Sequence, residues 1–396
     1  MKKILVLNSG SSSIKFQLFK LPEQIIICSG LIERIGFDDA KFELKVDHEK
    51  FEYELRIKDH QQGLELLSER LLDRKFNIIA SANEINVVGH RVVHGGSHFK
   101  KTRLITQEVK SKIKSLFDIA PLHNPPNLKG IEVAETIFPQ AKQVAVFDTA
   151  FHQSIPEVAY KYAIPNKFLT EHGVRVYGFH GTSHKYVSEK AIEYLGAKES
   201  KIISIHLGNG CSITAIKDGK SIDHSLGFGP VNGLIMGTRA GDIDASVIFY
   251  LNSKLGYSFD EINNLLQKQS GMLGLTGHSD LRDIEAKATK GDKDCLLALH
   301  MNAYRIKKFI GSYIAALNGL DTIIFTAGIG ENSEFIRRLV CDDLDTFGIE
   351  LSDKKNALRS KDIREVNTKE SKVKILVIPT NEELEIAKQA FELVKN

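Results

Sequence analysis

The chain opens with two apolar stretches separated by a polar turn. Apolar residues dominate Lys3–Leu7, small polar residues fill Asn8–Ser13, and alternating apolar positions return over Ile14–Phe19. Alternation with period two is typical of a β-strand, so the pattern predicts a β-hairpin. Its tip, rich in glycine and serine, presents backbone N–H groups and small hydroxyls that can surround phosphate oxygens, and Lys15 adds a positive charge. An ordinary surface turn is the alternative.

A second unit of the same form occurs in the other half of the chain. Lys201–Ile216 runs from an apolar strand through the small turn Gly208–Gly210 into another apolar strand. Two such units far apart indicate an internal duplication, with one phosphate-binding hairpin in each half. At 396 residues the chain is also too long for one ordinary core, so two domains are expected.

Strands and helices alternate along the rest of the chain. Further strands are predicted at Gln24–Ile32, Lys41–Arg56, Ile85–Ser97, Gln143–Phe147, Thr322–Phe325 and Val373–Ile378. Apolar residues at helical spacing predict helices at Gly63–Asp73, Leu128–Ile137, Lys185–Leu195, Asp260–Lys268, Leu296–Leu317 and Ser333–Val340. Ala120–Asn127 is expected to be a rigid loop before Leu128, and Thr326–Asn332 a glycine turn between a strand and a helix. Thr380–Glu383 fits a capping box at the start of a terminal helix. This order of elements predicts an α/β protein with mixed sheets.

Composition narrows the function classes. The chain is 42 % hydrophobic and 26 % charged, which is typical of a globular protein. A net charge of +3, with bases and acids interleaved, gives no argument for nucleic acid as a partner. No apolar run is long enough to span a membrane or to serve as a signal peptide. The scattered Cys28, Cys211, Cys295 and Cys341 lack the spacing of disulfide or metal pairs, which favours a reducing cytoplasm.

Several polar residues follow predicted strands, where open α/β sheets meet their ligands. Asp148 comes directly after one strand, although it could equally cap a turn. Arg91 could hold an anion through two hydrogen bonds or form a structural ion pair. His180 could donate to an anion or be a structural histidine, and Glu382 could face a metal or simply favour a helix start.

Other signals exclude common alternatives. His90, His94 and His98 would suggest metal ligands on a helix, but β-branched neighbours favour a strand, on which residues four apart lie about 13 Å apart. Asp223–Asp244 is glycine-rich around Arg239 and predicts a loop that closely approaches a ligand. The chain contains no P-loop, dinucleotide or protein-kinase signature.

Eight motifs, taken in order, resemble the acetokinase family along essentially the whole chain. They are NSGSSSIKF, HRVVHGG, FDTAFH, YGFHGTSH, HLGNG, MGTRAGDID, TAGIGEN and TNEE. The resemblance implies a duplicated ribonuclease-H-like, actin-like ATPase fold with a mixed sheet in each of two domains. The N-terminal domain would comprise residues 1–150 and 382–396, and the C-terminal, nucleotide-binding domain residues 151–381. It further implies reversible, Mg²⁺-dependent transfer of a phosphoryl group from ATP to acetate in a cytoplasmic homodimer, with Mn²⁺ as a possible substitute.

The resemblance also assigns roles to residues. Asn8 and Glu382 are the metal-associated positions. Arg91 and Arg239 resemble the pair that grips acetate and the moving phosphoryl group, Asp148 the essential acid and His180 the group that stabilises the transition state. The positions matching ATP contacts are Lys15, His206, Leu207, Gly208, Asn209, Gly210, Asp280, Leu281, Arg282, Gly328, Ile329, Gly330, Glu331 and Asn332. Those matching a small apolar pocket for the methyl group are Val93, Leu122, Phe179 and Pro230.

Two features refine this reading. A carboxylate acceptor is already ionised at pH 7, because such groups titrate near ~4, so no strong base is needed and Asp148 is expected to position Mg²⁺ or its water. Gly229–Gly233 replaces the family's Thr-Pro-Leu-Glu-Gly, and the side chain lost at Gly229 could let the pocket accept propionate.

Propionate kinase and a sugar or polyol kinase of the same superfamily are therefore the alternatives. A sugar or polyol kinase would need a base and a polar pocket. A chaperone-like or actin-like protein would instead hydrolyse ATP without an acceptor.

Overall fold

The computed structural model describes residues 1–197 and 199–395, and the chain divides into two compact units. Unit 1 comprises Met1–Phe151 and Asn381–Asn396, and unit 2 comprises His152–Thr380. The chain therefore leaves unit 1, builds all of unit 2, and returns to unit 1 for its last helix. The domain bounds predicted from the sequence, 1–150 with 382–396 and 151–381, differ from these units by one residue at each crossing.

Unit 1 is built on a mixed sheet of eight strands in the order β5-β4-β3-β2-β1-β6-β8-β7. The strands are β1 (Lys2–Ser9), β2 (Ser13–Leu21), β3 (Ile25–Glu33), β4 (Ala40–Val46), β5 (Glu49–Leu55), β6 (Ile85–Val92), β7 (Arg103–Leu104) and β8 (Lys142–Phe147). β1 pairs antiparallel with β2 and parallel with β6, so the two strand directions meet at β1. The predicted opening hairpin is thereby confirmed.

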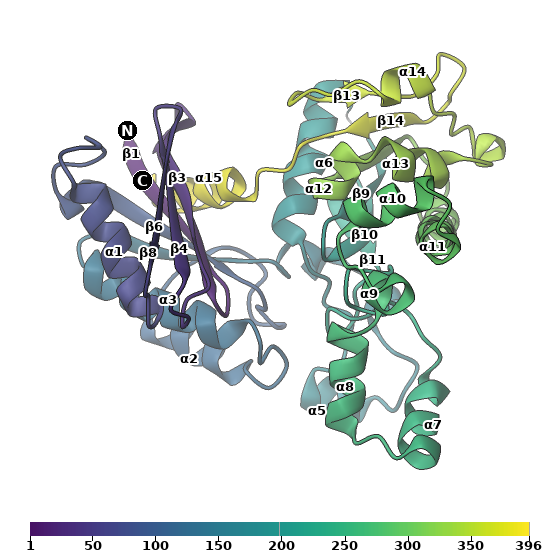
Figure 1. Cartoon of the computed structure of the whole chain (residues 1–396), viewed down its shortest axis with the longest axis horizontal. Helices are drawn as coiled ribbons and strands as arrows, with labels where there is room; N and C mark the ends of the chain where they lie inside the picture. Colours follow the sequence, from purple (N-terminus) through teal and green to yellow (C-terminus); the bar gives the residue numbers. More distant parts are fainter. Residues whose placement is uncertain (198, 396) are drawn as a thin grey trace. The chain divides into compact units, whose positions relative to one another are not determined.

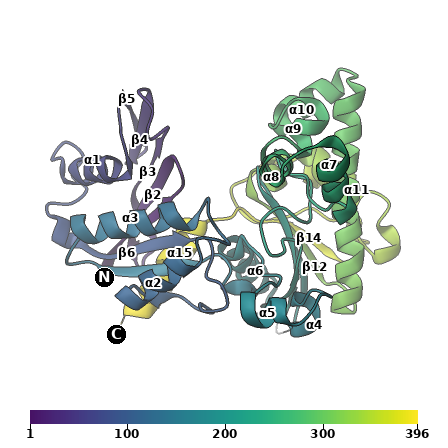
Figure 2. The same ribbon diagram turned by 90° about the horizontal axis from the view of Figure 1, so that it is seen from below.

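Helices cover both faces of this sheet (Figures 1 and 2). They are α1 (His60–Leu72), α2 (Gln107–Ser115), α3 (Asn124–Ile137) and α15 (Glu382–Val394), with the 3₁₀ turn η1 (Ala82–Glu84). On one face, Leu64 of α1 and Ala134 of α3 share a core with Leu5 of β1. On the other face, Ile386 of α15 packs with Ile4 and the neighbouring strands. The first strand and the last helix of the chain thus build one core.

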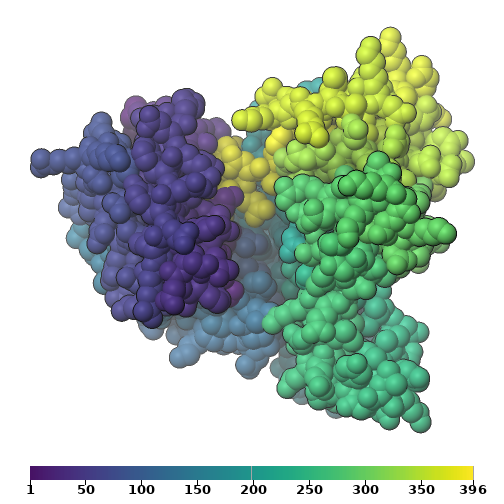
Figure 3. Space-filling view, viewed as in Figure 1, coloured from purple at the N-terminus to yellow at the C-terminus, as the bar shows by residue number. Residues whose placement is uncertain are grey.

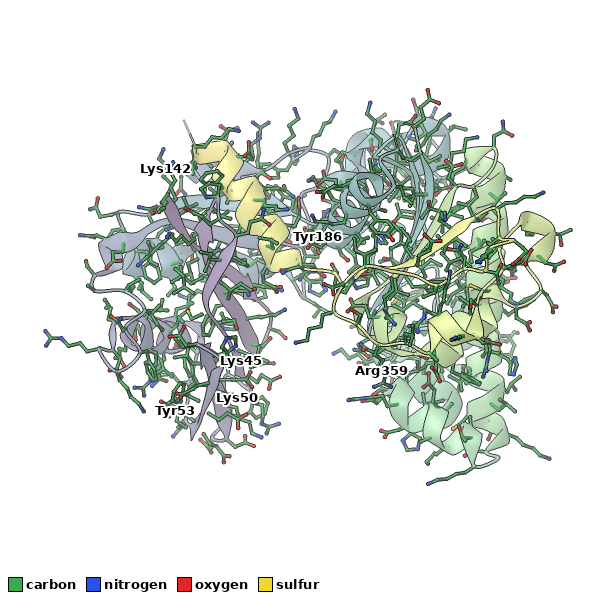
Figure 4. All side chains as sticks on the ribbon, turned by 90° about the horizontal axis from the view of Figure 1, so that it is seen from above. Lys45, Lys50, Tyr53, Lys142, Tyr186 and Arg359 are labelled. Carbon is green, nitrogen blue, oxygen red and sulfur yellow. The ribbon has the colours of Figure 1, made fainter. Side chains whose placement is uncertain are left out.

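The exposed edge of the sheet is protected by charge. The edge strand β5 and its neighbour β4 carry Lys50 and Lys45, which lie close together in Figure 4. Lys45 and Lys50 lie 2.7 and 2.8 Å from the Glu43 carboxylate. Charged edge strands disfavour pairing with another sheet, so this edge is unsuited to a strand-exchange interface.

Unit 2 contains a six-stranded mixed sheet in the order β11-β10-β9-β12-β14-β13. The strands are β9 (Lys201–Leu207), β10 (Cys211–Lys217), β11 (Lys220–His224), β12 (Thr322–Thr326), β13 (Arg364–Glu365) and β14 (Lys374–Val377). β9 pairs antiparallel with β10 and parallel with β12. The second predicted hairpin is confirmed.

The two sheets repeat one plan. In unit 1, β3-β2-β1 are antiparallel neighbours and β1-β6-β8 are parallel neighbours. In unit 2, β11-β10-β9 and β9-β12-β14 follow the same order and directions. This repeat confirms the predicted fold class, a duplicated ribonuclease-H-like α/β fold with a mixed sheet in each domain.

Most helices of the chain lie in unit 2. They are α4 (Glu157–Tyr160), α5 (Lys167–His172), α6 (Gly181–Leu195), α7 (Ala245–Leu255), α8 (Phe259–Lys268), α9 (Gly271–Thr276), α10 (Leu281–Thr289), α11 (Lys293–Leu317), α12 (Ala327–Asn332), α13 (Glu334–Cys341) and α14 (Asp353–Asn356), with the 3₁₀ turn η3 (Asp345–Phe347). A further 3₁₀ turn, η2 (Phe151–Ser154), lies where the chain crosses between the units. Among the described helices, none has the length and apolar character that a membrane crossing requires.

Several predicted boundaries are wrong, each for a local reason. Lys41–Arg56 is a hairpin rather than one strand, because Asp47 and His48 both adopt positive φ and close a tight turn. The stretch expected as a loop before Leu128 is already helical, since a proline fits the first turn of α3 without losing a helical hydrogen bond.

Two further helix starts differ from the prediction. Gly328–Asn332 forms the short helix α12 rather than a glycine turn. At the terminal helix the cap is Asn381, whose side chain accepts the Leu384 N–H, so the expected capping box is absent. An N-cap residue does the same job with one hydrogen bond to the backbone.

Candidate active site

In unit 1 a buried ion pair lies where parallel strands end. Arg91 is near the end of β6, and Asp148 directly follows β8. The Arg91 guanidinium donates to the carboxylate of Asp148, which is fully buried. Arg91 Nη1 also donates to Asn8 Oδ1 at 3.3 Å, and Arg91 Nε lies 3.9 Å from Glu382 Oε2. The structure thus brings together four predicted site residues, from three strand ends and the start of α15.

The charges of this group are strongly coupled. Burial raises the pKa of Glu382 to about 7, with Arg91 opposing and Asp148 adding to the shift. Burial by itself would lower the pKa of Arg91, but Asp148 and Glu382 raise it overall, so the guanidinium keeps its charge. Lys15, the predicted nucleotide contact, lies 2.7 Å from the Glu383 carboxylate. This part of unit 1 therefore contains two basic side chains, Arg91 and Lys15, each in contact with acidic side chains.

The segment after Arg91 is fixed by asparagines of α3. Asn127 Oδ1 accepts the Val93 N–H at 3.0 Å, and Asn127 Nδ2 donates to the Ser9 carbonyl at 2.7 Å. The Asn124 side chain binds the backbone of the next residue, His94: Oδ1 accepts the His94 N–H, and Nδ2 donates to the His94 carbonyl. Sequence reasoning placed both asparagines in a loop, and only their position beside two prolines could have marked them. Of the two pocket residues predicted here, Val93 is buried and Leu122 is half exposed.

In unit 2 the second hairpin, which is predicted to bind phosphate, lies beside His180 and Arg239. A Cβ built on Gly210 would lie 3.4 Å from both His180 Nε2 and Arg239 Nη2, so these two groups face the hairpin tip. Arg239 Nη1 donates to the Pro230 carbonyl at 2.7 Å. Burial lowers the pKa of Arg239, and Cys211 opposes that shift. Two predicted catalytic side chains therefore meet at the glycine that a phosphate would approach.

Serine hydroxyls connect His180 with other histidines. Ser212 Oγ lies 2.9 Å from His180 Nδ1 and 2.8 Å from His184 Nε2. The ring of the predicted ATP contact His206 stacks on that of His180, with centroids 4.4 Å apart, and His206 Nδ1 lies 2.8 Å from Ser183 Oγ. Sequence reasoning gave His184 no role, although it is the last residue of the YGFHGTSH motif, because its partners Ser204 and Ser212 lie on strands distant in the sequence.

Four predicted nucleotide-binding residues line one pocket of unit 2. Leu207, Gly208, Leu281 and Ile329 line a narrow pocket with a cavity volume of about 20 Å³. The other lining residues, mostly apolar, are Cys211, Ile235, Met236, Gly237, Met272, Ser279 and Asn302. The pocket is too narrow in this structure to enclose a nucleotide base, but its apolar lining and the adjacent glycine hairpin are the kinds of group that a base joined to phosphates would contact.

The remaining residues predicted to contact ATP support nearby backbone. Asp280 caps α10 through the Arg282 N–H and also pairs with the exposed Arg282 side chain, whose hydrogen bond lowers the pKa of Asp280 to about 2. The Glu331 carboxylate accepts the Thr380 N–H at 3.0 Å, and Asn332 donates to the Gly328 carbonyl at 2.8 Å. Gly330 is held through its carbonyl by a buried arginine at position 337.

The predicted site residues therefore fall into two groups. Unit 1 holds Asn8, Lys15, Arg91, Val93, Leu122, Asp148 and Glu382. Unit 2 holds Phe179, His180, His206, Leu207, Gly208, Asn209, Gly210, Pro230, Arg239, Asp280, Leu281, Arg282, Gly328, Ile329, Gly330, Glu331 and Asn332. Each group is coherent within its own unit. Their union in one active site, and the role of each residue, stay predictions.

The donor set of unit 1 fits a magnesium ion that arrives with a nucleotide. The Asn8 amide oxygen and the Asp148 and Glu382 carboxylates surround Arg91, and Mg²⁺ prefers such hard oxygen ligands. Within residues 1–197 and 199–395, no three His, Cys, Asp or Glu side chains are placed to hold a metal together. Mg²⁺ in kinases commonly takes one or two carboxylates and completes its shell with water and substrate phosphates.

Comparison with known proteins agrees with the fold and with the motifs. The chain is 65 % identical over 394 residues to an acetate kinase of Flavobacterium johnsoniae, with full coverage of both proteins. The crystal structure of Porphyromonas gingivalis acetate kinase matches it with a TM-score of 0.94 at 44 % identity over both whole chains. A propionate kinase from Francisella tularensis matches with the same TM-score, identity and coverage.

The family assignment rests on the whole length of the chain. The model of the acetokinase family matches residues 3–388, which include both hairpins, both groups of site residues and most of α15. The resemblance identified from eight short motifs is thus confirmed by a match that does not depend on any one of them. The chain belongs to the acetokinase family.

Proposed function

We propose that this chain transfers the terminal phosphoryl group of ATP to acetate, forming acetyl phosphate, and also catalyses the reverse reaction. The observation that carries this proposal is the Arg91 guanidinium, which the buried Asp148 holds at the carboxyl ends of strands β6 and β8. A fixed guanidinium suits a small carboxylate, because its planar fork matches two carboxylate oxygens. Family membership supports the same substrate class.

The chemistry needs positioning more than acid or base catalysis. Acetate is ionised at neutral pH, so its oxygen can attack phosphorus without first losing a proton. Asp148 contacts Arg91, and we therefore assign it the orientation of that guanidinium rather than proton abstraction. This changes the earlier expectation, in which Asp148 positions Mg²⁺ or its water.

Unit 2 supplies groups for the moving phosphoryl. Arg239 and His180 face Gly210, and both can donate hydrogen bonds to equatorial phosphate oxygens, where charge is spread in the transition state. Mg²⁺ bound with ATP would be held by Asn8 and Glu382 and would neutralise phosphate charge. The base of ATP is assigned to the pocket lined by Leu207, Leu281 and Ile329. Mn²⁺ offers similar ligand preferences and could substitute.

The acceptor pocket is assigned to Val93, Leu122, Phe179 and Pro230. Acetate is preferred over propionate in this proposal because curated relatives at 65 % and 51 % identity over nearly the whole chain are named acetate kinases. Propionate stays the second candidate, since a propionate kinase has an equally similar structure and Gly229 leaves open space beside Pro230.

A homodimer is supported by exposed apolar side chains in unit 2. Phe249 and Tyr250 on α7, Tyr257, and Phe259 on α8 are all more than two-fifths exposed, and α7 contacts α8. We call these four residues the α7–α8 face. α7 and α8 lie at one end of unit 2 in Figure 1, and their green atoms are open to view in Figure 3. Large exposed apolar patches mark interaction sites, and a second copy of the chain is the partner proposed here. The cytoplasmic location stays a prediction.

The first experiment is acyl phosphate formation from ATP and Mg²⁺, trapped with hydroxylamine, with acetate, propionate, butyrate and glycerol offered separately. Signal that is strongest with acetate supports the proposal. Signal that is stronger with propionate would make this chain a propionate kinase. Phosphorylation of glycerol, or ATP hydrolysis that no carboxylate stimulates, would overturn the proposed function.

A further inference from the structure

Both polar backbone groups of Phe179 are held by buried histidines of unit 2. The Phe179 N–H donates to His224 Nε2 at 3.1 Å. The Phe179 carbonyl accepts from His152 Nε2 at 2.9 Å. The two rings pack against each other with centroids 4.1 Å apart. We call His152, Phe179 and His224 the Phe179 clamp.

The backbone partners fix the proton positions on both rings. A backbone N–H can only donate, so His224 Nε2 carries no proton and Nδ1–H donates to Thr214 Oγ1, 2.7 Å away. A carbonyl can only accept, so His152 Nε2 carries the proton, and His152 Nδ1 lies 2.9 Å from Ser221 Oγ. Burial lowers the pKa of His224 well below its ordinary value and keeps it neutral. The clamp therefore uses two opposite tautomers.

Phe179 lies between two residues with a left-handed backbone conformation. Gly178 has φ +75°, and a Cβ there would lie 2.7–3.0 Å from atoms of the His152 side chain. His180 has φ +55°, a conformation that is costly for a residue with a side chain unless its surroundings impose it. Because Phe179 is the residue between them, fixing its two peptide groups fixes the backbone on which the His180 ring is mounted.

Geometry at His180 makes that constraint matter. His180 Nε2 and Arg239 Nη2 both face Gly210, and Ser212 holds His180 Nδ1. A small rotation of the Phe179–His180 peptide would move the imidazole away from this arrangement, and misplacement by about 1 Å can cost about 100-fold in rate.

We infer that His152 and His224 are positioning residues, which set the orientation of His180 through the backbone of Phe179. The inference rests on the proposed role of His180 in phosphoryl transfer. Neither histidine needs to touch a substrate for this role.

Amide side chains offer a matched test. The amide group of glutamine can replace Nε2 of histidine, and that of asparagine can replace Nδ1. His224→Gln therefore keeps an acceptor for the Phe179 N–H, whereas His224→Asn keeps only the Thr214 contact. In the same way, His152→Gln keeps a donor for the Phe179 carbonyl, whereas His152→Asn does not. We expect each asparagine variant to lower kcat by about 10- to 100-fold with little change in KM for ATP, and each glutamine variant to recover most of the loss.

Two further measurements separate positioning from folding. Within each pair the asparagine variant should have a somewhat lower thermal midpoint, because it leaves a buried backbone group of Phe179 unpaired, so kcat is compared at a temperature where both variants are folded. In a His180→Ala background, His224→Asn should change kcat by less than about twofold, because the residue that it positions is gone. Equal losses for glutamine and asparagine, or an undiminished loss without His180, would overturn the inference.

The tautomers give a readout that does not depend on activity. Imidazole ¹⁵N NMR of the wild-type protein should show His224 protonated at Nδ1 and His152 at Nε2. If either ring carries its proton on the other nitrogen, its hydrogen bond to Phe179 cannot form and the inference is overturned, even if the enzyme makes acetyl phosphate. If the wild-type protein makes no acyl phosphate from any acid, the proposed function fails, while the tautomers still test the clamp.

Discussion

The two terminal nitrogens of Arg239 face different partners. Nη1 donates to the Pro230 carbonyl, and Nη2 faces the Gly210 hairpin and His180. Lysine has a single nitrogen at its tip and cannot serve both directions. We therefore expect Arg239→Lys to lower kcat by roughly 100-fold or more, as when a transition-state donor is lost.

Arg305 provides the matched control for steady-state kinetics of Arg239→Lys. It also donates to carbonyls of this loop, those of Gly233 and Asp242, but none of its described contacts reaches Gly210. Arg305→Lys should stay within a few-fold of the wild-type kcat. Full activity of Arg239→Lys would show that the reaction does not need the Arg239 guanidinium.

Gly229 is a test of acceptor size. The position has open space around an added Cβ and no positive φ, so a threonine can be placed there without backbone strain. We expect Gly229→Thr to narrow the pocket beside Pro230 and to raise the ratio of kcat/KM for acetate over propionate by about 10-fold. One methylene in an apolar pocket is worth about 1–3 kcal/mol, which permits a change of this size.

Gly36→Thr would not serve as a control for Gly229→Thr, because Gly36 has φ +96° and a side chain there would be strained. Gly328, like Gly229, has open space and no positive φ, so Gly328→Thr should cause no backbone strain. Because Gly328 is a predicted ATP contact, this control should alter KM for ATP and leave the acetate to propionate ratio unchanged. An unchanged acetate to propionate ratio in Gly229→Thr, with both rates preserved, would show that this loop does not border the acyl pocket.

Buried histidines are distributed over several elements and give the protein a pH dependence. Burial lowers the pKa of His90 on β6 and of His94 to about 4, and lowers those of His184 and His224 well below 6.5. Between about pH 4 and 6.5 the unfolded chain therefore binds more protons than the folded one, so the free energy of unfolding must fall as the pH falls. Glu382, with its pKa raised to about 7, acts in the opposite sense.

We expect the free energy of unfolding, measured by urea denaturation, to be nearly level from pH 7 to 8 and to decline below about pH 6.5. Each such histidine contributes up to about 1.4 kcal/mol per pH unit in this range. His90→Gln, which keeps a polar group beside Gln143, should reduce the slope. Equal stability at pH 5 and pH 7 would contradict the neutral state of these rings.

At the scale of elements, sequence reasoning succeeded where one face of an element meets the core. In the hairpins β1–β2 and β9–β10, apolar residues either alternate with polar ones or form continuous runs, because one or both faces of these strands are buried. Both hairpins were predicted. Helix α7 was missed because none of its residues is buried, so its apolar side chains carry no core-facing period. Helix α12 was missed because its two glycines suggest a turn.

The candidate site could be predicted only in part, for a related reason. Motif resemblance located Arg91, Asp148 and His180, but the pairing of Arg91 with Asp148 depends on β6 and β8 being parallel neighbours. The clamp residues His152 and His224 come from separate segments that meet only through the sheet of unit 2. No local pattern records such a meeting, and buried polar residues leave no periodic signal.

At the scale of the whole molecule, the α7–α8 face predicts association between copies. We expect the wild-type protein to elute as a dimer in size-exclusion chromatography with light scattering. Phe249→Glu combined with Phe259→Glu should give a monomer, because two buried charges without partners oppose an apolar interface. Leu72→Glu, at the end of α1 in unit 1, replaces another exposed apolar residue and should leave the dimer intact. A dimer that survives the double substitution would place the interface elsewhere.

Helix α15 sets the order in which the protein can be completed during synthesis. Every residue of unit 2 leaves the ribosome before Asn381, yet the apolar surface around Ile4 stays uncovered until Ile386 and Ala390 emerge. A nascent or truncated chain therefore carries one finished unit and one with an open, aggregation-prone sheet. The same helix brings Glu382 to Arg91, so a chain cut short at its end lacks both a closed core and a complete set of acids.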